Sequence, residues 1–211
     1  MELAEKGILL VVSGFSGAGK GTITKAICRK YDNYALSISA TTREPRETEK
    51  DGVDYFFRTK EEFEDMIRDD ALIEFASYQG NYYGTPKDYV FHNLAEGKDV
   101  ILEIEVQGAL KVHEKYPDTP MIFVTAPSAK ILADRLRGRG TENEEKVQGR
   151  LKRAVEESEL MDAYDYILVN DKLEDAVEAL HQIVRTEHIK ANRNNKLIAE
   201  TKNDLKQYVN G

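Results

Sequence analysis

The sequence predicts an α/β fold in which helices flank a parallel sheet. Short apolar runs rich in β-branched residues recur along the chain, and helical patterns separate them. Several of these runs are almost entirely apolar, as expected for strands covered on both faces. Strands that alternate with helices are joined by right-handed crossovers, which makes the sheet parallel. The predicted strands are Ile8–Val12, Leu36–Ile38, Val100–Ile104, Met121–Val124 and Tyr166–Val169.

Helical patterns fill the stretches between these strands. The chain of 211 residues is long enough for one domain, or for one core that carries mobile insertions. No internal repeat breaks the alternation of strands and helices. The predicted helices cover about 22–31, 61–69, 86–96, 129–137, 144–162 and 172–190.

Two stretches interrupt this alternation within a predicted domain of residues 6–186. Residues 39–89 are rich in Tyr, Phe, Arg and Glu, and they predict a lobe inserted over the carboxyl edge of the sheet. Residues 135–153 are charged and contain Gly138 and Gly140, a composition typical of a mobile lid. A polar tail over 187–211 is expected to be helical, either as a solvated appendage or as a partner or dimer contact. The core is then expected to comprise residues 6–38, 90–134 and 154–186.

Composition narrows the classes of function. The net charge of −8 disfavours nucleic-acid binding, because a phosphate backbone favours clustered Lys and Arg. No apolar run approaches the roughly 20 residues that cross a bilayer, so no membrane partner is expected. The N-terminus lacks the pattern of a signal peptide. The single cysteine, Cys28, cannot form an internal disulfide, and we expect it in the core of a cytoplasmic protein.

The first predicted strand leads into a glycine-rich loop that opens a helix. Gly14, Gly19 and Lys20 stand at the G-x-x-x-x-G-K spacing of a phosphate-binding P-loop. Glycines let successive backbone N–H groups converge on phosphate oxygens, and the helix N-terminus adds positive potential. Lys20 is expected to reach the β- and γ-phosphates. The residues expected to contact a nucleoside triphosphate are Gly14, Phe15, Ser16, Gly17, Ala18, Gly19, Lys20, Gly21 and Thr22.

One position departs from the usual P-loop. Gly21 follows the lysine where a Ser or Thr commonly ligates Mg²⁺, and the hydroxyl comes one residue later, at Thr22. Thr22 is therefore expected either to contact Mg²⁺ through water or to hold a phosphate.

Arginines, aromatic residues and acids cluster further along the chain. Arg43 and Arg46 follow a predicted strand and could grip a phosphate with charge-assisted bonds. Glu74 lies beside an aromatic run, while Glu103 and Glu105 lie at the end of a predicted strand. Considered alone, the two arginines could equally be solvated surface charges.

Taken together, these motifs resemble the guanylate kinase family across roughly residues 6 to 186. Phe15 departs from the family pattern, since a proline is common at that point of the loop, and it should change loop stiffness rather than chemistry. The matching segments, in the family's order, are the P-loop ending in GKGT, S-x-S-x-T-T-R-x-x-R, G-x-D-Y-x-F, G-N-Y-Y-G-T, E-I-E-V-Q-G, G-R-G-T-E and V-N-D.

The resemblance implies a kinase that moves a phosphoryl group in line from ATP to GMP, with Mg²⁺. It implies that the phosphate of GMP is held by Ser39, Arg43, Arg46, Tyr55 and Tyr83. It implies that guanine is faced by Glu74, Thr85 and Glu105. A carboxylate can accept from guanine N1 and N2, whereas adenine would leave it unpaired. Glu103 and Glu105 also stand where a Mg²⁺ shell needs carboxylate, so base reading and metal ordering both stay open.

The charged segment near 135–153 has two interpretations. The resemblance assigns Arg135, Arg139 and Arg150 to ATP and the transferred group, and with Lys20 and Arg43 they form the expected catalytic set. The same arginines could instead form salt bridges with neighbouring glutamates. Asn170 and Asp171, at the end of the last strand, are expected to border adenine.

Two other functions and the oligomeric state remain open. A guanylate-kinase-like module that only binds peptides would lack a working P-loop, whereas Gly14, Gly19 and Lys20 are all present. A kinase for another phosphorylated acceptor would not need the residues that face guanine. The protein is expected to bind ATP and GMP as a monomer or homodimer.

Overall fold

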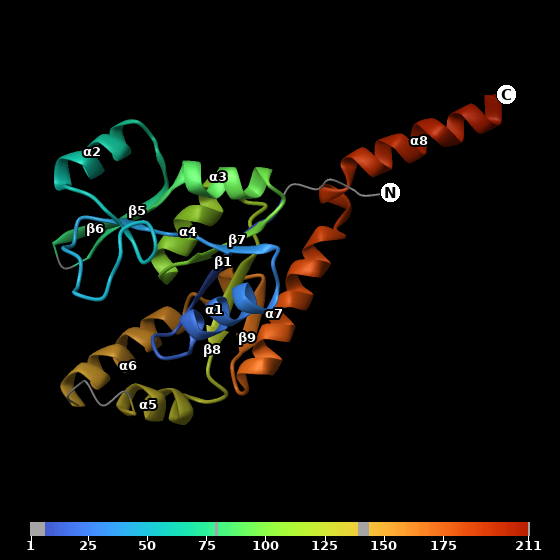
Figure 1. The fold of residues 1–211 in the computed structure, drawn as a ribbon. Coiled ribbons are helices and arrows are strands. Elements are labelled where there is room, and N and C mark those ends of the chain that lie inside the picture. The colour runs from blue at the N-terminus through green and yellow to red at the C-terminus, as the bar shows by residue number, and fades with distance from the viewer. Residues whose placement is uncertain (1–6, 79, 139–143, 211) are drawn as a thin grey trace.

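A five-stranded parallel sheet forms the centre of the molecule in the order β2-β7-β1-β8-β9 (Figure 1). The structure is a computed structural model that describes residues 7–78, 80–138 and 144–210. The predicted α/β class and parallel sheet are confirmed. The strands are Leu9–Gly14 (β1), Tyr34–Leu36 (β2), Asp99–Glu103 (β7), Met121–Thr125 (β8) and Tyr166–Val169 (β9).

Helices bury the apolar strands of this sheet. Leu10, Val11 and Val12 of β1 have no exposed surface, because β1 is the middle strand. Helix α1 packs against α7, while α3 contacts β7 and α4 contacts β1. The bounds of these helices are Lys20–Lys30 (α1), Lys87–Ala95 (α3), Val106–Lys115 (α4) and Leu173–His188 (α7).

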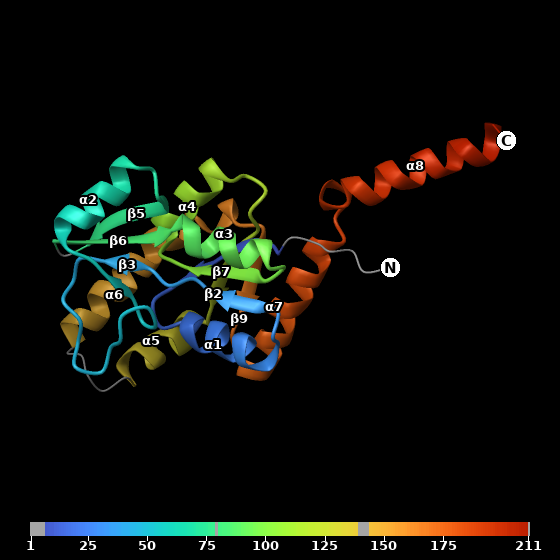
Figure 2. The same cartoon turned by 45° about the horizontal axis from the view of Figure 1, so that its top comes forward.

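A second, four-stranded sheet in the order β4-β3-β6-β5 lies beside the first (Figure 2). It is covered by α2 (Lys60–Arg68), whose buried Phe63 stacks on Tyr82 at a centroid distance of 5.3 Å. The sheet comes from the stretch predicted as an inserted lobe, and the division of the chain into separate units stays a prediction. The strands are Ala40–Thr41 (β3), Phe56–Phe57 (β4), Leu72–Tyr78 (β5) and Asn81–Pro86 (β6).

The remaining helices run from the predicted lid to the C-terminus. Helices α5 (Ala129–Arg137) and α6 (Glu144–Ser158) pack on each other. Helix α8 (Asn195–Asn210) extends away from the rest of the chain (Figures 1 and 2). Two short 3₁₀ turns, Met161–Ala163 and Ala191–Arg193, precede β9 and α8. In the part of the chain that the structure describes, no helix has the length and apolar character to cross a membrane.

Some predicted elements were wrong in position or missing. Helix α4 is absent from the sequence prediction, because it contains Gly108 and has no side-chain cap at Glu105. Strand β2 begins two residues before the predicted Leu36, since its pairing with β7 starts at Tyr34 opposite Asp99. Helix α6 ends at Ser158 rather than near 162. Helix α7 reaches His188, so the first residues of the predicted tail belong to it.

Candidate active site

The P-loop connects β1 to α1 at the carboxyl edge of the sheet. Gly14, Gly17 and Gly19 have φ angles of 132°, 86° and 94°, which side chains disfavour. A Cβ atom at Gly14 would lie 2.1 Å from the backbone oxygen of Val124. Both the backbone conformation and the close approach of β8 therefore require glycine in this loop.

Two polar side chains fix the loop from within. Lys20 Nζ donates to the backbone oxygens of Gly14 at 2.6 Å and Phe15 at 3.1 Å. The buried amide of Asn170 donates to the backbone oxygen of Ala18 at 2.8 Å. Asn170, expected beside adenine, thus braces the P-loop in this structure, and its role at adenine stays a prediction.

A cavity of about 570 Å³ opens along the P-loop and joins two predicted parts of the site. Glu103 and Glu105, at the end of β7, line it together with the P-loop. Thr24 on α1 has no exposed surface and donates to Glu103 Oε2 at 2.8 Å, which holds that carboxylate against the helix. The other residues that line the cavity are Phe15, Ser16, Gly17, Gly19, Lys20, Gly21, Thr22, Lys25, Ala26, Arg29 and Leu173.

The absence of a side chain at Gly21 leaves room for the carboxylate of Glu103 beside the P-loop. A Cβ atom at Gly21 would stand 3.2 Å from Glu103 Oε1, so a side chain there would press on the carboxylate. Among the described residues, no group of three or more His, Cys, Asp or Glu side chains could hold a metal unaided. Mg²⁺ commonly uses one or two carboxylates together with substrate phosphates and water. The carboxylate of Glu103 fits this pattern of ligation, and the hydroxyl of Thr22 lines the same cavity.

Arginine and tyrosine gather where the phosphate of an acceptor is expected. The guanidinium of Arg43 lies 5.4 Å from the Tyr55 ring centroid, and the Tyr55 and Tyr83 rings are 6.2 Å apart. Burial raises the pKa of Tyr55, so its hydroxyl stays protonated and can donate at neutral pH. Arg46 is exposed, and Ser39 is half-buried with its backbone oxygen bonded to Phe56.

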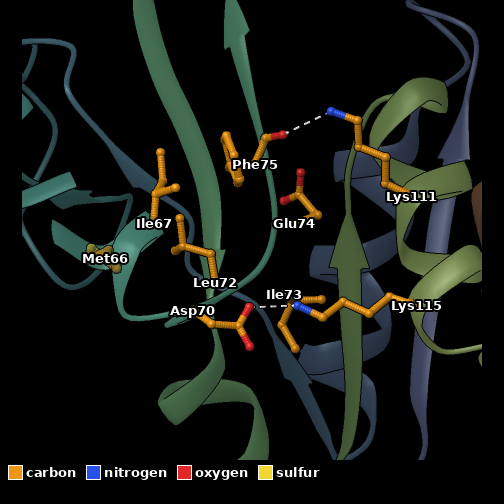
Figure 3. Close-up of a pocket in the computed structure, with 9 residues that line it drawn as sticks. All are labelled: Met66, Ile67, Asp70, Leu72, Ile73, Glu74, Phe75, Lys111 and Lys115. Atoms are coloured by element: carbon orange, nitrogen blue, oxygen red, sulfur yellow. Dashed lines mark hydrogen bonds and ion pairs between the residues drawn. The ribbon is translucent and has the colours of Figure 1, made fainter. Parts of the chain in front are cut away.

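Glu74 and Thr85 meet where guanine is expected. Thr85 Oγ1 donates to Glu74 Oε1 at 2.8 Å, and burial raises the pKa of Glu74. A hydroxyl has one proton, so Thr85 donates either to Glu74 or to guanine O6, and not to both. Figure 3 shows Glu74 between β5 and Lys111 of α4, at the wall of a separate pocket of about 200 Å³.

The predicted lid arginines differ in their surroundings. Arg150 on α6 donates to Ser16 of the P-loop at 2.9 Å, while Arg135 on α5 makes a long contact of 3.5 Å with the Asp171 backbone oxygen. Helix α5 ends at Arg137, and Arg139 lies outside the described residues. Two further arginines of the segment form ion pairs: Arg137 pairs with Glu144 at 3.0 Å, and Arg153 pairs with Glu105 and Glu157. Arg150 therefore contacts the P-loop, and Arg137 and Arg153, also in the segment predicted as a lid, form ion pairs.

Comparison with known proteins decides the family. Residues 6–187 match the family model described as guanylate kinase. The chain belongs to the guanylate kinase family. The guanylate kinase of Oceanobacillus iheyensis is 52% identical over 191 residues, which cover 90% of this chain and 93% of that protein. The guanylate kinase of Lactococcus lactis is 51% identical with the same coverage. The crystal structure of guanylate kinase from Anaplasma phagocytophilum has a TM-score of 0.71 and 33% identity, and covers 90% of each chain.

Sequence reasoning missed two side chains of this guanylate kinase site. Thr24 holds Glu103, and Glu49 accepts two hydrogen bonds from Arg43. Thr24 lies four residues after Lys20, so the helical period places both on one side of α1. Glu49 lies three residues after Arg46, but an exposed turn of mixed charge gives no signal about which acid meets which arginine.

Proposed function

We propose that this protein transfers the γ-phosphoryl group of ATP to GMP, giving ADP and GDP. The observation that carries the proposal is the single cavity lined by the P-loop and by Glu103 and Glu105. A donor triphosphate on the loop would have its terminal phosphoryl group directed into the cavity that the acceptor also enters.

Guanine is the base that suits the acceptor side. It presents donors at N1 and N2, which Glu74 can accept from the wall of its own pocket, and Glu105 offers a second carboxylate at the P-loop cavity. AMP would leave a buried carboxylate without a donor, at a cost of about 1–3 kcal/mol. Arg43, Arg46, Tyr55, Tyr83 and Ser39 would hold the acceptor phosphate.

The acceptor is an ionised phosphate oxygen, so transfer needs no general base. Lys20 would neutralise charge on the moving phosphoryl group, joined by Arg150 and by Arg135 and Arg139 of the predicted lid. Mg²⁺, held by Glu103 and Thr22 directly or through water, would supply charge neutralisation at the ATP phosphates. Closure of the lid would exclude water and prevent hydrolysis of ATP.

The test is ADP release from ATP when GMP, AMP, CMP and UMP are offered separately. We expect rapid ADP release with GMP and little with the other three. Equal rates with AMP and GMP would remove the guanine assignment, and no ADP release with any of the four would remove the proposed function. The negative charge of the chain favours free nucleotides over nucleic acid as partners, and sedimentation would distinguish monomer from homodimer.

A further inference from the structure

The carboxylate of Glu49 receives three hydrogen bonds from the turn that carries the two arginines. Arg43 Nη2 donates to both carboxylate oxygens at 2.9 Å, and the backbone N–H of Arg46 donates to Oε2 at 2.9 Å. The backbone N–H of Glu49 donates in return to the Arg46 oxygen at 3.0 Å. The carboxylate thus closes the turn and attaches Arg43 to it.

The guanidinium of Arg43 is fixed on several sides. Besides the Glu49 contacts, its Nη1 donates to the backbone oxygen of Glu44 at 2.6 Å. The rings of Tyr55 and Phe57 lie 5.4 and 5.9 Å from it. An arginine side chain has several rotatable bonds, so a guanidinium held in advance loses less entropy when it binds a phosphate.

We propose that Glu49 is a positioning residue for the acceptor site, and that it orients Arg43 for the phosphate of GMP. The inference rests on the proposed function, in which Arg43 binds that phosphate. The hydrogen bond from the Arg46 N–H lowers the pKa of Glu49, and Arg43 lowers it further, although partial burial acts in the opposite direction. The carboxylate of Glu49 is therefore ionised at neutral pH.

The alternative is a carboxylate that occupies the place of the phosphate and leaves when GMP arrives. Such a group would lie in the open site, yet the side chains of Glu49 and Arg43 are only 14% and 20% exposed. Of the two arginines in the turn, the exposed one is Arg46, which bonds Glu49 through its backbone N–H. The carboxylate of Glu49 is therefore mostly covered by the turn and Arg43 rather than open to the site.

The direction in which the KM for GMP changes when Glu49 is replaced distinguishes a residue that positions Arg43 from one that occupies the phosphate site. An ionised carboxylate repels the GMP phosphate, so removing its charge alone would lower the KM for GMP. Removing a positioning carboxylate would raise the KM instead. Glu49→Gln keeps the shape of the side chain but removes the charge and one acceptor oxygen.

We expect Glu49→Gln to raise the KM for GMP about tenfold, because a charge-assisted bond is lost. The KM for ATP and the melting temperature should stay at their wild-type values. Guanosine lacks the phosphate, so its inhibition constant against GMP should not change. The matched control is Glu47→Gln, which removes the same charge from an exposed side chain that forms no hydrogen bond or ion pair within the described residues. Its KM for GMP should be unchanged or lower.

An unchanged or lowered KM for GMP in Glu49→Gln would overturn the inference. Equal weakening of GMP and guanosine, or a lower melting temperature, would also overturn it, because Glu49 would then support the fold of the lobe. If the wild-type protein did not phosphorylate GMP, the proposed function itself would be wrong. The wild-type assay therefore tests the proposed function, and the Glu49→Gln assay tests the role of Glu49.

Discussion

Thr85 donates a 2.8 Å hydrogen bond to Glu74 across the two strands β5 and β6. The other carboxylate oxygen, Oε2, lies toward Gly108 of α4, where a Cβ atom would stand 3.2 Å away. Oε2 has no hydrogen-bond donor in the described parts of the chain. One oxygen is therefore bonded within the protein, and Oε2 is the oxygen that would accept from guanine in the proposed function.

Replacing this carboxylate should reduce the preference for guanine. In Glu74→Gln, the amide accepts poorly from two donors at once and adds an N–H facing guanine N1. We expect kcat/KM for GMP to fall about 10- to 100-fold, with a smaller change for AMP. The ratio of the two specificity constants is the measurement, and Glu114→Gln, on an exposed face of α4, is the control. A ratio equal to that of the wild type would show that Glu74 does not read the base.

The same substitution should stabilise the fold in a pH-dependent way. Burial raises the pKa of Glu74, so the folded protein binds that proton more tightly than the unfolded chain does. The stabilising contribution is full below the unfolded pKa and is lost as pH rises through the folded one. At pH 7 Glu74→Gln should therefore melt about 2–4 °C higher than the wild type. Thermal melts from pH 4 to 8 should show the gap closing toward acid, and a gap independent of pH would contradict this.

The sequence predicted the elements whose pattern is local. Four of the five apolar runs became parallel strands, while Leu36–Ile38 overlaps β2 only at Leu36. The G-x-x-x-x-G-K spacing located the P-loop between β1 and α1. Lys20 and Gly14 follow from that spacing because the loop folds on itself within a few residues. Helix α4 was missed because its apolar positions surround a glycine and no cap marks its start.

Contacts between distant segments could not be predicted in the same way. Thr24 and Glu103 are 79 residues apart, and Arg150 and Ser16 are 134 apart. Such pairs depend on which strands become neighbours and on how two sheets face each other, and a linear pattern contains neither. The resemblance to a family named the residues expected at the acceptor site. It did not predict that the hydroxyl of Thr85 donates its one proton to Glu74.

Lys20 should be required for turnover but not for folding. Its ammonium group bonds two backbone oxygens of its own loop, and these two bonds fix the loop rather than the apolar core. We expect Lys20→Ala to lower kcat by on the order of 10²–10³, as when one charge-stabilising donor is removed. The melting temperature should change by less than about 4 °C. Lys30→Ala, on the exposed end of α1, is the control and should keep wild-type turnover.

Glu103 should set the requirement for Mg²⁺. Thr24 holds its carboxylate at the P-loop cavity, and Glu103→Gln would keep that hydrogen bond while removing the charge. We expect the Mg²⁺ concentration for half-maximal rate, at fixed ATP, to rise about 10-fold. The KM for GMP should change little. An unchanged Mg²⁺ dependence with a raised KM for GMP would assign Glu103 to the acceptor instead.

Asp99 should control stability without affecting catalysis, because it lies at the start of β7, at the end of the sheet away from the P-loop. Its buried carboxylate accepts from the Ile8 backbone at 2.9 Å and from the Asn33 amide at 3.0 Å, and lies 2.8 Å from His188 Nε2. Asp99→Ala would leave the buried Ile8 N–H without an acceptor and would remove the contact between β7 and His188 at the end of α7.

Each unsatisfied buried group costs about 1–3 kcal/mol, so we expect Asp99→Ala to destabilise the fold by about 3 kcal/mol. For a chain of this length that lowers the melting temperature by roughly 6–12 °C. The KM values for both nucleotides, measured well below the melting temperature, should match the wild type. Asp32→Ala removes an exposed acid from the neighbouring turn and should leave the melting temperature unchanged. If Asp99→Ala melted within about 2 °C of the wild type, the network around Asp99 would be replaceable by water, and α7 would be held by its apolar packing and its other bonds to the sheet, such as those of Tyr166 and Tyr34.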